Sequence, residues 1–547
     1  MSLNASSDSD SALDVIVVGA GFAGLYMLYR LRQLGLRVRV FEAGSGVGGT
    51  WFWNRYPGAR CDVESTQYSY SFSSELQQQW RWSEKYATQP EILRYIDHVA
   101  DRFDLRRDIT LNTRVTDAHF DATRGVWRVG VHPGDSPLEC RFLVMAVGCL
   151  SSANRPDYPG LGQFGGRVLH TGEWPHERVD FSGQRVAVIG TGSSGIQCIP
   201  PIAAQATRLT VFQRTPNFAI PAWNEPLTDA ADQEIKAAYP ALRAQAQQRP
   251  TGYVFPFNDA PASATPPAER DAVYEKFWRL GGLKFMGAFR DLFTDEAANT
   301  TAAQFVRDKI RARVHDPAVA ERLLPLGVIG SKRLCVETQY YETFNRDNVD
   351  LVDLRATPIE SFTAQGLRTQ GLPTQGGGRE FNFDAVVFAT GFDAMTGSIL
   401  RVDIVGRDGE SLRDAWRAGA QTYLGLGVAG FPNLFLVNGP GSPSVLSNMV
   451  QSIEYNVDWT TRCLGHMRSA EWQQIEVEVQ AQQDWVAHCN AVVERTLRAR
   501  EDSWYVGANI PGRERVFMPY AGGVPAYRAR CEDVVANGYR GFSFTRT

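Results

Sequence analysis

The sequence predicts an α/β fold built from two similar parallel-sheet units, and two observations support this prediction. First, a β-branched run that leads into a glycine-rich turn occurs twice, in residues 14–25 and 185–195. Such a run is typical of a buried parallel strand that enters a helix. Second, the spacing to the end of the next short strand is equal, 23 positions from Gly19 to Glu42 and from Gly190 to Gln213. Equal spacing indicates that the two units share one architecture.

The first unit carries the glycine pattern of a dinucleotide-binding turn, with Gly19, Gly21 and Gly24 in G-x-G-x-x-G spacing. The first glycine permits a tight turn, the second lets the backbone approach a pyrophosphate, and the third lets the helix pack against the strand. The helix N-terminus then faces the phosphates. Glu42 ends the next strand, where a carboxylate binds the ribose hydroxyls of an adenosine. This unit therefore predicts a site for FAD or NAD.

The second unit predicts a different nucleotide. The same glycine spacing recurs at Gly190, Gly192 and Gly195. The position of the acid is taken by Gln213, which is followed by Arg214 and Thr215. A carboxylate there repels a ribose 2′-phosphate, whereas a neutral amide beside a guanidinium attracts one. Arg214 as a solvated surface cation is the alternative. The sequence thus predicts an NADP site here and, with the first unit, a flavoprotein supplied by NADPH.

These units predict an α/β protein with two Rossmann-like dinucleotide-binding domains, one for FAD and one for NADP, and a helical insertion in the NADP domain. We expect residues 1–148 and 389–547 to form the FAD domain, and residues 149–223 and 331–388 to form the NADP domain. Residues 142–148 and 384–391 are expected to be strands at the crossovers between them. In the insertion, residues 224–330, helix starts are expected at Thr265-Pro266 and Asp316-Pro317, where a capping side chain precedes proline.

Composition narrows the class of protein. The net charge of −4 gives no basic face for nucleic acid. The eight cysteines include no C-x-x-C pair, so we expect reduced thiols and neither a disulfide frame nor a metal site. The N-terminal segment lacks the basic start and apolar stretch of a secretion signal, and no early apolar run is long enough for a bilayer. We therefore expect a cytoplasmic protein, with no membrane, nucleic-acid or protein partner.

The segment after Glu42 separates this chain from dithiol flavoproteins. Disulfide reductases share the two-nucleotide layout and need two neighbouring redox cysteines at this place. Residues 48–62 contain only Cys61, which excludes dithiol chemistry there. Aromatic side chains dominate instead, and Trp51, Trp53 and Tyr56 are expected to form an apolar wall beside a flavin. Asp62 is the acid of this run.

Two long motifs carry a resemblance to a known family. The linker to the second unit matches F-x-G-x-x-x-H-x-x-x-W-P at Phe164, Gly166, His170, Trp174 and Pro175. Residues 48–62 match G-G-x-W-x-x-x-x-[FY]-P-G-x-x-x-D. In these motifs, and over residues 14–544, the chain resembles the single-chain, FAD-containing Baeyer–Villiger monooxygenases. The resemblance implies that a small-molecule ketone is converted to an ester or lactone with O2 and NADPH, through a flavin C4a-peroxide, and that sulfides are oxidised as well.

The resemblance also implies roles for individual residues. Arg333 matches the catalytic arginine beside the flavin, and Asp62 matches the acid that holds it. Lys332 matches a residue that contacts the NADP 2′-phosphate together with Arg214 and Thr215. Trp504 matches a tryptophan of a mobile segment that reaches bound NADP. The further cofactor-binding residues implied are Gly49, Thr50, Trp51, Tyr68, Val115, Met449, Thr191, Ser193, Ser194 and Gln197, the substrate loop is Ser444, Val445 and Leu446, and the domain-coupling residues are His170 and Trp174.

Alternatives stay open at this stage. A histidine in a linker is more often a structural hydrogen-bond donor than a catalytic base, and we favour the structural role for His170. Without the resemblance, Lys332 and Arg333 are equally well explained as solvated charges. A flavin monooxygenase that oxidises nitrogen or sulfur would share both nucleotide units without needing Arg333. An NADPH oxidase without an organic substrate would release hydrogen peroxide at one equivalent per NADPH.

Overall fold

The first sheet surrounds the first glycine-rich turn. The computed structural model describes residues 13–371 and 377–546, so the acidic N-terminal segment considered above falls almost wholly outside the described residues. The strand order is β17-β4-β5-β6-β1-β2-β3, with β18 paired to β6. The strands are β1 (Leu13–Val18), β2 (Val38–Phe41), β3 (Ile109–Thr110), β4 (Arg114–Asp121), β5 (Val126–His132), β6 (Leu138–Met145), β17 (Asp403–Val405) and β18 (Leu434–Leu436). The centre of β1 is fully buried, as its β-branched run predicts.

The second sheet repeats the parallel part of the first sheet, β3-β2-β1-β6, with the strands β12-β9-β8-β16 in the same order. Its order is β12-β9-β8-β16-β7, and every pair is parallel. The strands are β7 (Arg167–His170), β8 (Arg185–Ile189), β9 (Arg208–Gln213), β12 (Val349–Asp353) and β16 (Ala385–Phe388). Gly19 N donates to Phe41 O at 2.8 Å, and Gly190 N donates to Phe212 O at 3.0 Å in the matching place. The predicted fold class, with two nucleotide-binding units, is confirmed.

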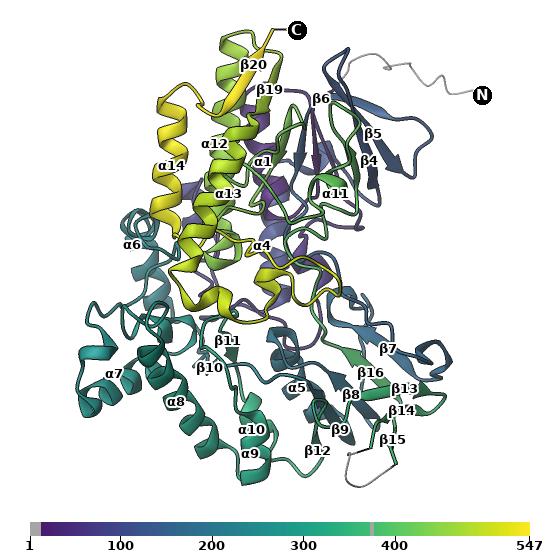
Figure 1. Cartoon of the computed structure of the whole chain (residues 1–547), viewed down its shortest axis with the longest axis vertical. Coiled ribbons are helices and arrows are strands. Elements are labelled where there is room, and N and C mark those ends of the chain that lie inside the picture. The colour runs from purple at the N-terminus through teal and green to yellow at the C-terminus, as the bar shows by residue number, and fades with distance from the viewer. Residues whose placement is uncertain (1–12, 372–376, 547) are drawn as a thin grey trace.

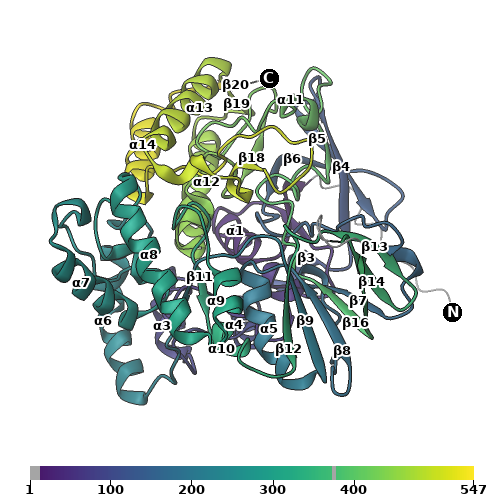
Figure 2. The same ribbon diagram turned by 60° about the horizontal axis from the view of Figure 1, so that its bottom comes forward.

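A helix follows each glycine-rich turn. Further helices lie in the part of the chain between β9 and β12 of the second sheet. Helix α1 (Phe22–Gln33) follows the first turn and α5 (Ser193–Gln205) the second. Helices α6 (Asp229–Gln247), α7 (Pro267–Leu280) and α8 (Glu296–Arg313) lie on the left in both Figure 1 and Figure 2, and α9 (Pro317–Leu323) lies nearer the centre. The short strands β10 (Ala219–Pro221) and β11 (Cys335–Glu337) pair in parallel, so the chain leaves for these helices and returns at one place.

One predicted helix start is right and the other is wrong by one residue. Asp316 Oδ1 accepts hydrogen bonds from the backbone of Ala318 and Val319, so Asp316 caps α9 and Pro317 is its first residue. Helix α7 begins instead at Pro267. The Thr265 hydroxyl donates to Pro261 O at 2.7 Å and therefore does not cap the helix.

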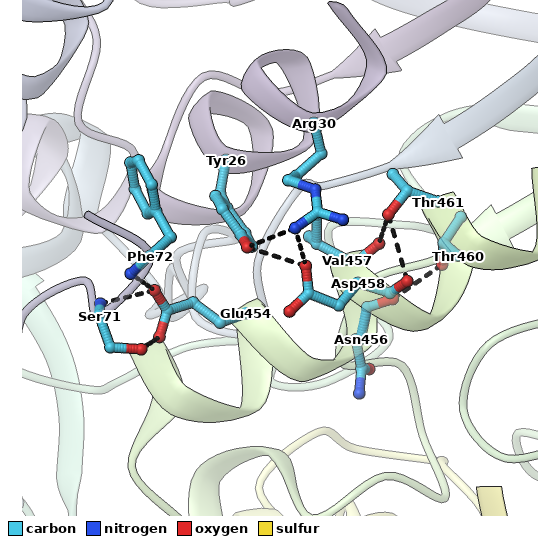
Figure 3. Close-up of polar contacts among 10 residues, drawn as sticks. All are labelled: Tyr26, Arg30, Ser71, Phe72, Glu454, Asn456, Val457, Asp458, Thr460 and Thr461. Atoms are coloured by element: carbon cyan, nitrogen blue, oxygen red, sulfur yellow. Dashed lines mark hydrogen bonds and ion pairs between the residues drawn. The ribbon is translucent and has the colours of Figure 1, made fainter. Parts of the chain in front are cut away.

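The C-terminal helices return to the first unit, where α12 (Met449–Ser469) packs against α1. The other two are α13 (Val479–Glu494) and α14 (Val524–Ala536), and all three are drawn in yellow-green to yellow. Two carboxylates on α12 hold it in place (Figure 3). Asp458 accepts from Tyr26 Oη at 2.8 Å and pairs with Arg30 of α1. Glu454 is buried and accepts from the backbone and hydroxyl of Ser71 and from Phe72 N.

The remaining elements are short or peripheral. In the part of the chain that the structure describes, no helix has the length and apolarity needed to cross a bilayer. The three strands β13 (Ile359–Thr363), β14 (Gly366–Thr369) and β15 (Arg379–Asn382) form an antiparallel sheet, and β19 (Gln474–Val477) pairs with β20 (Phe542–Thr545). The other helices are α2 (Thr50–Trp53), α3 (Ser74–Gln79), α4 (Gln89–Arg102), α10 (Tyr340–Thr343) and α11 (Leu412–Ala415).

Candidate active site

A cavity of about 1590 Å³ lies where the carboxyl ends of the two sheets face each other. Ligands of open α/β sheets bind at this edge, outside the strand ends. Residues of both glycine-rich turns line the cavity. Most predicted site residues line it, namely Gly19, Gly21, Glu42, Gly49, Thr50, Trp51, Asp62, Tyr68, Val115, Gly190, Thr191, Gly192, Ser193, Ser194, Gln197, Arg214, Thr215, Lys332, Arg333, Val445, Met449 and Trp504.

The first half of the cavity fits an unphosphorylated adenosine dinucleotide. A Cβ on Gly24 would lie 1.8 Å from Gly19 O, so this glycine serves helix–strand packing and not the cavity surface. Gly21 and Gly49 approach closely, and a Cβ on Gly49 would lie 3.0 Å from Gly21 Cα. Glu42 accepts from Ala20 N at 2.8 Å and Gly44 N at 2.7 Å. Its carboxylate has acceptor capacity left for ribose hydroxyls.

The second half fits a dinucleotide that carries an additional phosphate. A Cβ on Gly195 would lie 2.2 Å from Gly190 O, which repeats the packing of the first unit, whereas a Cβ on Gly192 would meet open space. Arg214 is exposed and lines the cavity together with Lys332. Among the described residues, neither cation has a carboxylate partner. Two unpaired cations beside a glycine-rich turn fit a 2′-phosphate.

Gln213 does not contact the nucleotide site, although its position at the end of the strand predicts such a contact. Its side chain is fully buried and its Nε2 donates to Arg322 O at 2.7 Å. It does not line the cavity. Preference for a phosphorylated ribose therefore rests on the positive charges and on the absence of a carboxylate, and not on an amide contact.

Arg333 is a cavity-lining cation that a carboxylate and a backbone carbonyl hold in place. It donates through Nε and Nη2 to both oxygens of Asp62, the latter contact at 2.8 Å, and through Nη1 to the carbonyl of Val445. Burial alone disfavours its charge, but the ion pair with Asp62 outweighs burial and raises the pKa of Arg333 above the usual guanidinium value. The guanidinium is therefore a fixed and permanent positive charge in the cavity.

The predicted substrate loop contacts Arg333 through a backbone carbonyl, that of Val445. Residues Ser444–Leu446 form a single 3₁₀ turn that is separated from α12 by Ser447 and Asn448. Val445 lines the cavity, whereas Ser444 and Leu446 do not. Ser444 is buried with a left-handed backbone (φ 41°) and its hydroxyl contacts the sulfur atoms of Met395 and Met449. The carbonyl of Val445 thus ties the position of this loop to Arg333.

His170 and Trp174 lie outside the cavity lining. His170 ends β7, and its Nδ1 accepts from Gly172 N at 3.0 Å. Its Nε2 lies 3.2 Å from Thr390 Oγ1 and 3.3 Å from Asn154 O. Burial lowers the pKa of His170, which agrees with a neutral ring that donates from Nε2. Trp174 is buried in the core of the second sheet.

Several contacts of the cavity were missed at the sequence level. Tyr56 Oη donates to Gln197 Oε1 at 2.8 Å, and Gln197 Nε2 donates to Arg60 O at 3.0 Å, which joins the first unit to α5 of the second. Tyr56 belongs to the second motif, which was the available signal. Glu501 and Asn509 also line the cavity. Asn509 ends the segment that resembles the family's mobile segment around Trp504, whereas nothing in the local sequence marks Glu501.

Comparisons with known proteins agree with this geometry. Residues 13–239 match the pyridine nucleotide-disulphide oxidoreductase family. A Baeyer–Villiger monooxygenase of Pseudooceanicola batsensis is 42% identical over 98% of this chain and 96% of the relative. A phenazine N-monooxygenase of Lysobacter antibioticus is 40% identical over 98% of each chain. A solved structure of an oxidized steroid monooxygenase bound to NADP is 52% identical, with a TM-score of 0.93 over 98% of this chain and 100% of that chain. The chain belongs to the Baeyer–Villiger monooxygenase family.

Proposed function

We propose that this enzyme inserts one oxygen atom of O2 beside the carbonyl of a small-molecule ketone, with FAD as its resident cofactor and NADPH as its reductant. The observation that carries the proposal is the position of Arg333. It is a partly buried guanidinium, held by Asp62 and by the Val445 carbonyl, in a cavity that both dinucleotide turns line. A cation in such a place stabilises anionic oxygen, which ketone oxidation requires.

The protein contributes positioning and electrostatics to this reaction. When bound, FAD and NADPH supply hydride transfer and the activation of O2. Arg333 keeps its proton at any working pH, so it acts as a fixed donor and not as an acid. Asp62 orients the guanidinium through two contacts. Trp51, whose Nε1 donates to Tyr68 Oη at 3.2 Å, belongs to an aromatic wall that excludes water from the cavity.

Cofactor preference follows from the charges of the two halves. We assign Glu42 to the ribose of FAD, and Arg214, Thr215 and Lys332 to the 2′-phosphate of NADPH. The division into an FAD domain (1–148 and 389–547), an NADP domain (149–223 and 331–388) and a helical insertion (224–330) is proposed with it. His170 and Trp174 are assigned to coupling of the two domains, because His170 contacts Thr390 of the second crossover segment and Asn154, which follows the first. The enzyme is proposed to work in the cytoplasm as a single component.

Oxidation at nitrogen is the second candidate function. It is favoured by the phenazine N-monooxygenase, which has nearly the same identity to this chain as the Baeyer–Villiger relative. The shared scaffold therefore supports both reactions. The partly buried Arg333–Asp62 pair supports the ketone reaction, because oxygen transfer to nitrogen passes through no oxyanion that needs a cation.

A product assay separates these functions. Purified FAD-loaded enzyme is incubated with NADPH, O2 and a panel of linear, cyclic and aryl ketones, and in parallel with phenazine and a tertiary amine. Esters or lactones formed at one equivalent per NADPH support the proposal. N-oxides without any ester support the second candidate. Hydrogen peroxide at one equivalent per NADPH, whichever compound is added, excludes both.

A further inference from the structure

A segment distant in sequence forms hydrogen bonds to the loop that carries Lys332 and Arg333. We call residues 498–513 the strap. Glu501 of the strap accepts from Val328 N with one carboxylate oxygen and from Ser331 Oγ, at 2.8 Å, with the other. Ser331 is 2% exposed. Its hydroxyl also lies 2.8 Å from Val328 O, but a charged acceptor forms the stronger bond.

A second strap residue holds the same loop. Arg498 donates to Gly330 O at 3.2 Å, and its guanidinium lies 4.0 Å from the centre of the Phe293 ring. The two strap side chains therefore contact three of the five residues that precede Lys332. Gly327 leaves room for the carboxylate, because a Cβ there would lie 1.8 Å from Glu501 Oε1.

The other end of the strap is bound to Phe392 and Asp393, directly after the crossover segment 384–391. Asn509 Nδ2 donates to Phe392 O at 2.7 Å, and Arg513 pairs with Asp393, with one contact at 2.9 Å. The strap thus connects residues 392–393 to the loop of the two cations, and Asn509, Trp504 and Glu501 of the strap line the cavity.

From these contacts we infer that Glu501 is a positioning residue for Lys332 and Arg333. It touches neither cation. It fixes Ser331, the residue directly before them, so that Lys332 faces the second dinucleotide half while Arg333 stays on Asp62. This assignment rests on the proposed function only for the identity of the nucleotide. Loss of the carboxylate frees the loop, so binding of a 2′-phosphate must then order it and becomes weaker.

The test measures nucleotide binding without turnover. The dissociation constants of NADP+ and NAD+ are determined by equilibrium titration of the FAD-loaded full chain, with Glu501→Ala, Ser331→Ala and the double variant. Glu514→Gln is the matched control, an exposed carboxylate of the residues that follow the strap. Gly327→Ala is a second route, since it displaces the Glu501 carboxylate without changing any charge. Melting temperatures from flavin fluorescence show whether each variant keeps its fold.

We expect Glu501→Ala to weaken NADP+ binding at least on the order of tenfold, because both hydrogen bonds to its carboxylate are lost, and NAD+ binding much less. Gly327→Ala should act in the same direction, and Glu514→Gln should have no effect. The double variant should be no weaker than Glu501→Ala, because the two residues act through one contact. Unchanged NADP+ binding in Glu501→Ala, or full additivity with Ser331→Ala, would overturn the inference. If Glu501→Ala fails to hold FAD, Ser331→Ala and Gly327→Ala decide in the same way.

Failure of this inference is distinguishable from failure of the proposed function. Ester formation by the wild-type enzyme tests the function and involves no variant. A wild type that makes ester, together with variants that bind NADP+ normally, rejects only the positioning role. A wild type that makes no ester, with weakened NADP+ binding in the variants, rejects only the ketone reaction.

Discussion

Replacing Arg333 by alanine tests whether its guanidinium is needed for ester formation. The substitution removes three donated hydrogen bonds, two to Asp62 and one to Val445 O. Loss of one preorganised donor to a developing oxyanion costs on the order of 10²–10³ in rate, or about 2.7–4 kcal/mol. Ester formation should therefore fall at least about hundredfold, while FAD stays bound and is still reduced by NADPH.

Stability changes have to be separated from this loss of rate. Breaking a buried ion pair by removing one partner costs about 3–5 kcal/mol. The Asp62 side chain is 21% exposed, which places the expected cost toward the lower end of that range. The double variant Arg333→Ala/Asp62→Asn removes the unpaired charge, so it should recover stability without recovering ester formation.

The assay follows ester by mass spectrometry, NADPH by absorbance and hydrogen peroxide by a coupled peroxidase. For Arg333→Ala we expect NADPH consumption that yields peroxide in place of ester. Ester formed at the wild-type rate by a folded, FAD-loaded Arg333→Ala enzyme would refute the role of the guanidinium.

Four further outcomes are expected. Arg214→Ala should raise the NADPH KM about tenfold with a much smaller effect on NADH, because one phosphate contact is lost; an unchanged ratio of the two KM values would remove Arg214 from the phosphate site. Gly192→Ala should fold normally and bind NADPH poorly, whereas Gly195→Ala should lower the melting temperature, since only its Cβ meets backbone; equal melting temperatures would contradict this. Burial lowers the pKa of His170 in the folded protein. The neutral ring therefore contributes fully to stability above pH about 6.5, and this contribution is lost as the pH falls below that value. In His170→Gln the melting temperature should depend less on pH between pH 7.5 and 5.5 than it does in the wild type. Glu454→Ala should destabilise the protein by about 2–3 kcal/mol, because the donors of Ser71 and Phe72 lose their acceptor (Figure 3); a melting temperature equal to that of the wild type would show that water replaces the carboxylate.

The glycine-rich units were predictable from the sequence because their physics is local. A glycine with positive φ, such as Gly19 (φ 100°) or Gly190 (φ 111°), is fixed by its own turn. The spacing to the next strand end is set by one helix of similar length. Strand pairing and the repeated hydrogen bond to Phe41 and Phe212 follow from this local pattern.

The site itself was predictable only where motifs carried it. Asp62 and Arg333 lie 271 positions apart, and no periodicity links them. Glu501 and Ser331 have no motif and were missed for the same reason. Gln213 shows the opposite error, because its register is correct but its side chain turns into the core toward Arg322. Register along a strand predicts which face a residue occupies, and not the partner that its side chain finds.

Oxygen transfer from O2 to a ketone is the central claim, and isotope labelling tests it most directly. The FAD-loaded enzyme is supplied with NADPH, ¹⁸O2 and each ketone of the panel, and products are analysed by mass. We predict an ester or lactone that carries one ¹⁸O atom, formed at one equivalent per NADPH oxidised. Consumption of NADPH with every ketone returned unlabelled and unchanged, and all oxygen recovered as peroxide, would contradict the claim.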